Sequence, residues 1–246
     1  MEFDALGQLL GGGPLNVVFV GLALVGMVIA IGIWVLEFSG RTITRHGIVA
    51  NNMNWNAQAI ALVAVSAAIY IAGRPLQFQF IPGIGGFNPT LALAPVLAVL
   101  FGLPGAVGVT FSMPIGDAIS GALTLGSVAG FLSHTFVTWL PYKMVRDPSM
   151  RTKASIASFY LWGIVIGPII HAIVIPGWLD FTNVLPAAVA WGAVTIAILL
   201  NHMVTAAVIA GPLLYVLYPR VKQWGMFHGD RHVAGRRQRP ATTGGA

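Results

Sequence analysis

The chain has 246 residues, of which 57% are hydrophobic and only 8% are charged, and its mean hydropathy is +0.82. A water-soluble domain carries about 25% charged residues, so this composition excludes a soluble globular domain and indicates a protein surrounded by lipid. The formal net charge is +6, and the absence of cysteine excludes disulfides, thiolate metal sites and cysteine nucleophiles.

Seven apolar stretches follow one another along the chain. A helix needs about 20 residues to cross a bilayer, and most of these stretches reach that length. We therefore predict an all-α, polytopic transmembrane bundle of about seven helices, in which one N-terminal helix precedes a six-helix core. The predicted spans are 15–36, 55–73, 89–102, 105–119, 123–140, 154–173 and 186–217.

The basic residues orient these spans. If the N-terminus lies outside, twelve of the thirteen Lys and Arg residues fall on the cytoplasmic side, and Arg74 alone lies outside. This asymmetry satisfies the positive-inside rule and explains the basic charge without nucleic acid. It predicts an N-terminal outer segment, extra helix and basic inner loop (1–54), a membrane core (55–219), and a basic cytoplasmic tail (220–246) that contacts anionic lipid.

Two charged residues lie close to the predicted outer face. Asp117, in "TFSMPIGDAISG", is the acid that lies well inside a span, and Arg74 ends the second span at a similar depth. A charge at membrane depth is costly and often functional. Two roles stay open for the pair: an anchor for a polar ligand, or a lock between two helices. Glu37, at the inner end of the first span, is expected to be solvated.

Other polar or aromatic side chains are candidates for a substrate site. His134 and His202 lie near the middle of their spans and His171 near an outer end, either lining a cavity or bonding neighbouring helices. His134 stands out because Ser133 and Thr135 flank it. Asn88 opens the third span, where free backbone N–H groups favour anions, and Trp191 offers a stacking face.

Small residues recur along the second span at Ala57, Ala61, Ala64 and Ala68. Small side chains at this spacing let a second helix approach closely, either within this protein or from another subunit. The chain contains no GxxxxGK[ST], HExxH or GxSxG motif, so we expect no enzymatic activity, no cofactor and no metal site.

The segment from Trp55 to Tyr218 resembles the substrate-binding S component of energy-coupling factor (ECF) vitamin transporters. The shared order is an Ala-rich helix, a long outer loop, "FNPTLALAPVLAVLFGLPGAVGVTFSMPIGD", and then "SVAGFLSHTFVTWLPYKM". The resemblance implies an outward-facing pocket for a vitamin or similar small molecule. It also implies docking, through Ala57 and Ala61, onto a membrane coupling subunit that works with separate ATPases.

The chain departs from that family in its additional first helix and its basic tail. The family's nickel/cobalt branch carries a metal-binding histidine at the N-terminus, whereas this chain begins "MEFDALG", so no metal substrate is expected. The leading hypothesis is an inner-membrane substrate-capture subunit that uses Arg74, Asn88, Asp117, His134 and Trp191. The alternatives are a structural subunit of a membrane complex, and a channel or secondary carrier for protons or cations.

Overall fold

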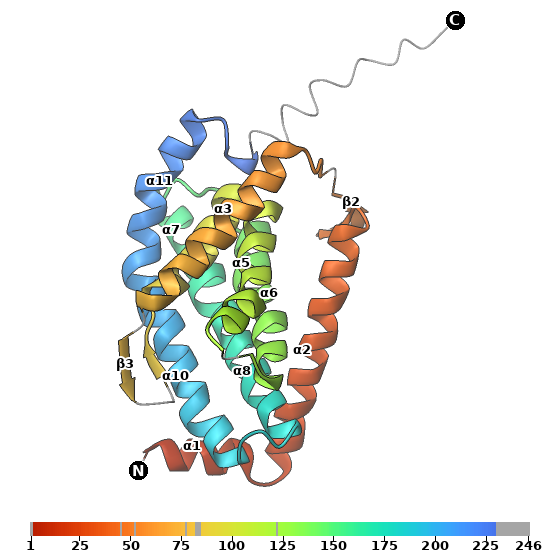
Figure 1. The fold of residues 1–246 in the computed structure, drawn as a ribbon, viewed down its shortest axis with the longest axis vertical. Helices are drawn as coiled ribbons and strands as arrows, with labels where there is room; N and C mark the ends of the chain where they lie inside the picture. Colours follow the sequence, from red (N-terminus) through yellow and green to blue (C-terminus); the bar gives the residue numbers. More distant parts are fainter. Residues whose placement is uncertain are drawn as a thin grey trace, which may run out of the picture.

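The structure is a computed structural model that describes residues 2–44, 46–51, 53–76, 78–81, 85–121 and 123–229. It confirms the all-α prediction: helices form one elongated bundle, and the described strands form only two small hairpins (Figure 1). The predicted tail falls largely outside the described residues, since the description ends at Gly229.

The elements follow the predicted spans in chain order. The first half of the chain contains α1 (Glu2–Gly11), α2 (Pro14–Phe38), the hairpin β1 (Arg41–Thr44) and β2 (Gly47–Ala50), α3 (Ala57–Gly73), the 3₁₀ turn η1 (Arg74–Leu76), the hairpin β3 (Phe78–Ile81) and β4 (Gly85–Phe87), the 3₁₀ turn η2 (Pro89–Ala92), α4 (Leu93–Phe101) and α5 (Leu103–Ile119).

The second half consists of helices, several of them joined end to end through π-helical turns. It contains α6 (Leu125–Met144), α7 (Lys153–Phe159), η3 (Tyr160–Ile166), α8 (Gly167–Phe181), α9 (Ala187–Val189), η4 (Ala190–Val194), α10 (Thr195–Leu199), η5 (Leu200–Val204), η6 (Ala206–Ala210) and α11 (Gly211–Gln223). The segments 153–181 and 187–223 are therefore each one long helical rod.

Four helical stretches among the described residues are long and apolar enough to cross a membrane: Pro14–Phe38, Ala57–Leu76, Lys153–Phe181 and Ala187–Gln223. Their outward faces carry large apolar side chains such as Val17, Val28 and Val208, each more than 60% exposed. Water would disfavour such a surface, whereas hydrocarbon would not. The protein thus has the architecture of a multi-pass membrane protein.

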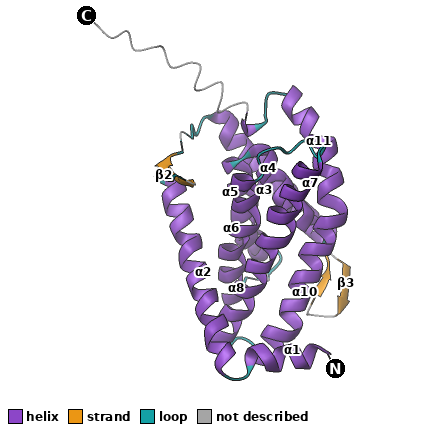
Figure 2. Cartoon of the chain, turned by 180° about the vertical axis from the view of Figure 1, so that it is seen from behind, coloured by secondary structure: helices purple, strands orange, loops and turns teal. Residues whose placement is uncertain are grey.

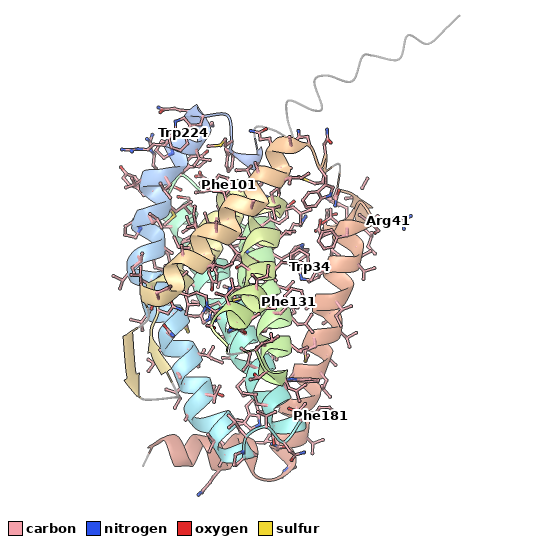
Figure 3. All side chains as sticks on the ribbon, in the orientation of Figure 1. Trp34, Arg41, Phe101, Phe131, Phe181 and Trp224 are labelled. Carbon is pink, nitrogen blue, oxygen red and sulfur yellow. The ribbon has the colours of Figure 1, made fainter. Side chains whose placement is uncertain are left out.

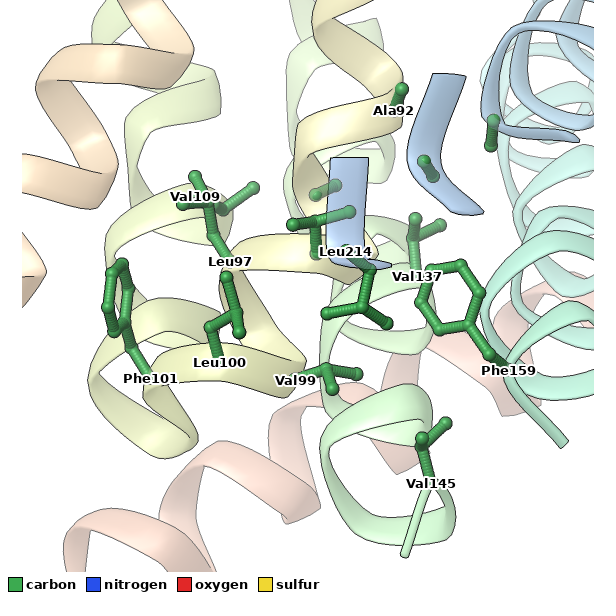
Figure 4. Close-up of a cluster of buried hydrophobic side chains, with 14 of the residues drawn as sticks. Ala92, Leu97, Val99, Leu100, Phe101, Val109, Val137, Val145, Phe159 and Leu214 are labelled. Atoms are coloured by element: carbon green, nitrogen blue, oxygen red, sulfur yellow. The ribbon is translucent and has the colours of Figure 1, made fainter. Parts of the chain in front are cut away.

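The remaining predicted spans, α4, α5 and α6, form the interior of the bundle. α4 is buried along nearly its whole length, and Gly102, in a left-handed conformation (φ 69°), turns the chain directly into α5. Leu97, Leu100 and Val109 from this helical hairpin belong to the same buried hydrophobic cluster as Leu214 of α11 (Figure 4). Because the surrounding helices shield α4, α5 and α6, shorter or more polar helices suffice at these positions.

We name the two ends of the bundle after residues labelled in Figure 3: the Phe181 end lies at the bottom of that view and the Trp224 end at the top. α1 lies across the Phe181 end, against α9 and η4, and the β1–β2 hairpin lies at the Trp224 end (Figures 1 and 2). The β3–β4 hairpin lies beside the long C-terminal rod, near α10. α3 crosses the bundle obliquely.

The additional N-terminal helix α2 is an integral part of the bundle, since it packs against α6 and α8. Glu37 lies in the last turn of α2. The expectation that Glu37 is solvated is wrong, because its side chain is only 1% exposed. The carboxylate accepts hydrogen bonds from Trp139 Nε1 (2.7 Å) and Thr42 Oγ1 (2.5 Å) and lies 3.0 Å from Lys143 Nζ. The sequence could not reveal the burial of Glu37, because the residues that bond to its carboxylate come from another helix and from a hairpin.

Candidate functional site

Three histidines from three separate helices meet in the interior of the bundle. His134 lies in α6, His171 in α8 and His202 in the π-helical turn η5, and all three are buried. Their ring centroids are 5.4 Å (134–171), 5.8 Å (134–202) and 4.6 Å (171–202) apart. One potential ligand atom from each residue lies within 4.8 Å of the other two. We call His134, His171 and His202 the histidine cluster.

The histidine cluster contains hydrogen-bonding atoms that nothing described in the structure satisfies. Within the described residues, Nδ1 of His134 and Nδ1 of His171 are buried and have no hydrogen-bond partner. An unpaired polar atom inside an apolar bundle costs about 1–3 kcal/mol, and such atoms are rare unless a ligand, ion or water pairs with them. The cluster therefore has the capacity to bind something further.

Tyr70 of α3 connects the histidine cluster to the neighbouring polar residues. Its hydroxyl lies 3.0 Å from Nε2 of His134, and both side chains are buried. Arg74, which caps α3 and begins η1, follows four residues later on the same side, because residues i and i+4 are neighbours on a helix. His134, Tyr70, Arg74 and Asp117 thus follow one another from the interior toward the end of α3, and we call these four side chains the polar path.

The predicted pairing of Arg74 with Asp117 is confirmed. Arg74 Nη2 lies 2.5 Å from Asp117 Oδ1, and Arg74 Nη1 donates to the carbonyl of Met113 at 3.2 Å. The two side chains are 26% and 15% exposed, so the pair is partly accessible. Gly116 makes room for it, since a Cβ there would lie 2.1 Å from the guanidinium. The ion pair locks α3 to α5 and also forms the accessible end of the polar path.

The two faces of α3 have different surroundings. Tyr70 belongs to the buried face, with Ala59, Leu62 and Ser66. The four predicted interface residues lie on the opposite side at 100° per residue and all are exposed: Ala57, Ala61, Ala64 and Ala68. We call these four the alanine stripe. No helix of the described chain covers it, so a close-packing partner would have to be another molecule.

The other predicted site residues have structural contacts. Asn88 caps η2 through its side chain, and its backbone N–H donates to Asn201 Oδ1 at 2.8 Å. Trp191 is 1% exposed, donates from Nε1 to Asp180 at 2.9 Å, and packs against Phe19. The predicted roles of Asn88 and Trp191 in substrate binding stay predictions.

The polar neighbours of His134 in the sequence do not join it in the structure. Ser133 Oγ donates to the backbone carbonyl of Ala129, and Thr135 Oγ1 accepts from Trp34 Nε1 at 2.7 Å. The partners of His134 are instead distant in sequence. The expectation that His171 lies near an outer end is wrong. The helix continues to Phe181, ten residues beyond His171, which therefore lies at the depth of His134, nine residues after the start of α6.

Comparisons with known protein families, curated proteins and solved structures found no match. Three imidazoles, two of them with an unpartnered Nδ1, can coordinate a metal ion or hydrogen-bond a polar solute. A partly exposed Arg–Asp pair at the end of the polar path can contact a charged solute before it reaches the cluster.

Proposed function

We propose that the protein is a solute-capture subunit in the inner membrane, similar to an S component, that binds a small solute within the bundle. It performs no catalysis, and the energy for uptake comes from a coupling subunit and ATPases on other chains. The solute enters from the outer face, past the Arg74–Asp117 pair, and reaches the histidine cluster.

The polar path inside an otherwise apolar bundle is the observation that carries this proposal. A purely structural role accounts for the Arg74–Asp117 pair, which joins α3 to α5. It does not account for the unpartnered Nδ1 atoms of His134 and His171, because buried polar groups that serve packing are normally hydrogen-bonded. A bound solute would satisfy both atoms.

The alanine stripe supports a partner in the membrane. Four exposed small side chains in line let another helix pack closely on α3. Because α3 also carries Tyr70 on its other side and is capped by Arg74, a coupling subunit docked on the stripe would contact the helix that contributes to the solute path. This arrangement gives docking a direct mechanical route to the site.

The orientation with the N-terminus outside and the C-terminus in the cytoplasm can be tested with single cysteines. Wild-type chain contains no cysteine and serves as the blank. Exposed Ser120 follows α5, and exposed Thr44 ends β1. We expect an impermeant maleimide to label Ser120→Cys in intact cells and Thr44→Cys only after permeabilisation. The reverse pattern would contradict the proposed orientation.

The capture proposal predicts that the protein retains a solute when purified in mild detergent. Organic ligands would be identified by mass spectrometry and inorganic ions by elemental analysis of the same sample. We expect Arg74→Ala and Asp117→Asn each to reduce retention by about tenfold, because either change breaks the ion pair and leaves its partner charged and unpaired at membrane depth.

Arg146→Ala is the matched control, because Arg146 is exposed after α6, at the Trp224 end. It should retain the solute at the wild-type level, with an unchanged melting temperature. Well-folded wild-type protein that holds neither an organic nor an inorganic solute would contradict capture and favour a structural role.

A further inference from the structure

We propose that the histidine cluster is a binding site for a divalent transition-metal ion of the zinc, nickel or cobalt type. This inference rests on the proposed capture function and names the class of solute. It reverses the sequence-based expectation that the chain has no metal site. The reversal comes from a juxtaposition: α6, α8 and η5 bring together three imidazoles that are far apart in the sequence.

The geometry of the cluster is close to that of a three-histidine site. A tetrahedral ion with nitrogen ligands at about 2.0–2.1 Å holds them about 3.3 Å from one another. The potential ligand atoms of the cluster lie within 4.8 Å of one another, so each pair has to close by at most about 1.5 Å. We expect side-chain rotation to close this gap when an ion binds.

Tyr70 supplies the outer support that a metal-bound histidine needs. The second nitrogen of a metal ligand normally makes a hydrogen bond that fixes the tautomer and the ring orientation. In His134, Nε2 lies 3.0 Å from the Tyr70 hydroxyl; in the tautomer in which Nε2–H donates to the Tyr70 oxygen, the unpartnered Nδ1 keeps its lone pair for the ion.

The ligand set favours a transition metal over calcium or magnesium. Imidazole suits zinc, nickel and related ions, whereas calcium and magnesium prefer oxygen ligands. The cluster provides three nitrogen ligands and contains no carboxylate, so a divalent ion keeps an open coordination position and excess positive charge. The open position leaves room for a water molecule or another ligand, as in other three-histidine sites.

The test is metal titration of purified full-length protein in detergent, stripped with a chelator and carrying no histidine tag. Co²⁺ is the probe, because tetrahedral nitrogen coordination gives visible ligand-field bands; Zn²⁺ and Ni²⁺ are titrated by calorimetry. We expect about one ion per chain. His134→Gln, His171→Gln and His202→Gln should each weaken binding about 100-fold or more.

Tyr70→Phe keeps the ring and removes only the hydroxyl, so it tests the site even if a histidine variant fails to fold. Loss of an outer-shell partner typically weakens metal binding about 10–100-fold, and we expect a change in that range. His46→Gln, in the exposed turn between β1 and β2, and His232→Gln, in the basic tail, are the controls and should bind as wild type does.

Binding that disappears in His46→Gln or His232→Gln but survives in the three cluster variants would overturn the proposal. So would protein that binds no ion. If such protein still retains an organic solute, the metal assignment fails and capture stands; if it retains no solute of any kind, both fail.

Discussion

Replacing Glu37 with alanine is expected to lower the free energy of unfolding by about 3–5 kcal/mol, the cost of leaving one member of a buried ion pair without its partner. Glu37 is almost completely buried, and Lys143 Nζ lies 3.0 Å from its carboxylate. The substitution also removes the acceptor for Trp139 Nε1 and Thr42 Oγ1. Unfolding in a denaturing detergent, followed by circular dichroism, would measure the loss.

The double variant Glu37→Gln/Lys143→Met is the informative control. It removes both charges, so no uncompensated ion stays buried, and glutamine still offers an oxygen to Trp139. We expect it to recover most of the stability that Glu37→Ala loses, because replacing a whole buried ion pair is often neutral. If Glu37→Ala were as stable as wild type, the Glu37 carboxylate would have to be solvated.

Gly108→Ala is expected to lower the free energy of unfolding by about 1–3 kcal/mol, the usual cost of overpacking a tight interface. A Cβ at Gly108 would lie 2.4 Å from the carbonyl oxygen of Val63 and 2.8 Å from Cβ of Ser66, both on α3. Backbone cannot move aside as a flexible side chain can, so α3 has to shift away from α5. The shift would displace Tyr70 and Arg74, and solute retention should fall as well.

Gly21→Ala and Gly32→Ala are matched controls in α2, because an added Cβ at either glycine has no heavy atom within 4 Å. Alanine is the better helix former by about 1 kcal/mol, so these variants should be as stable as wild type or slightly more stable. If Gly108→Ala, Gly21→Ala and Gly32→Ala have the same melting temperature in the same detergent, close packing of α3 on α5 is not a determinant of stability.

The spacing of polar residues along the chain was sufficient to predict part of the site. Arg74 and Asp117 are charged residues in apolar surroundings near the outer ends of the second and fourth predicted spans, and the cost of isolated charge in lipid makes their pairing predictable. The pairing is present at 2.5 Å. The same reasoning failed for Glu37, because its position at the end of a span does not show whether neighbouring elements cover it.

The sequence by itself determined that the chain is helical and lies in lipid, because apolar length and the need to satisfy backbone hydrogen bonds leave few alternatives. Only the tertiary structure decided which polar groups meet. His134, His171 and His202 belong to three helices, and their convergence depends on how those helices rotate and pack. It equally decided that the alanine stripe faces outward, since helical spacing defines a face but not what covers it.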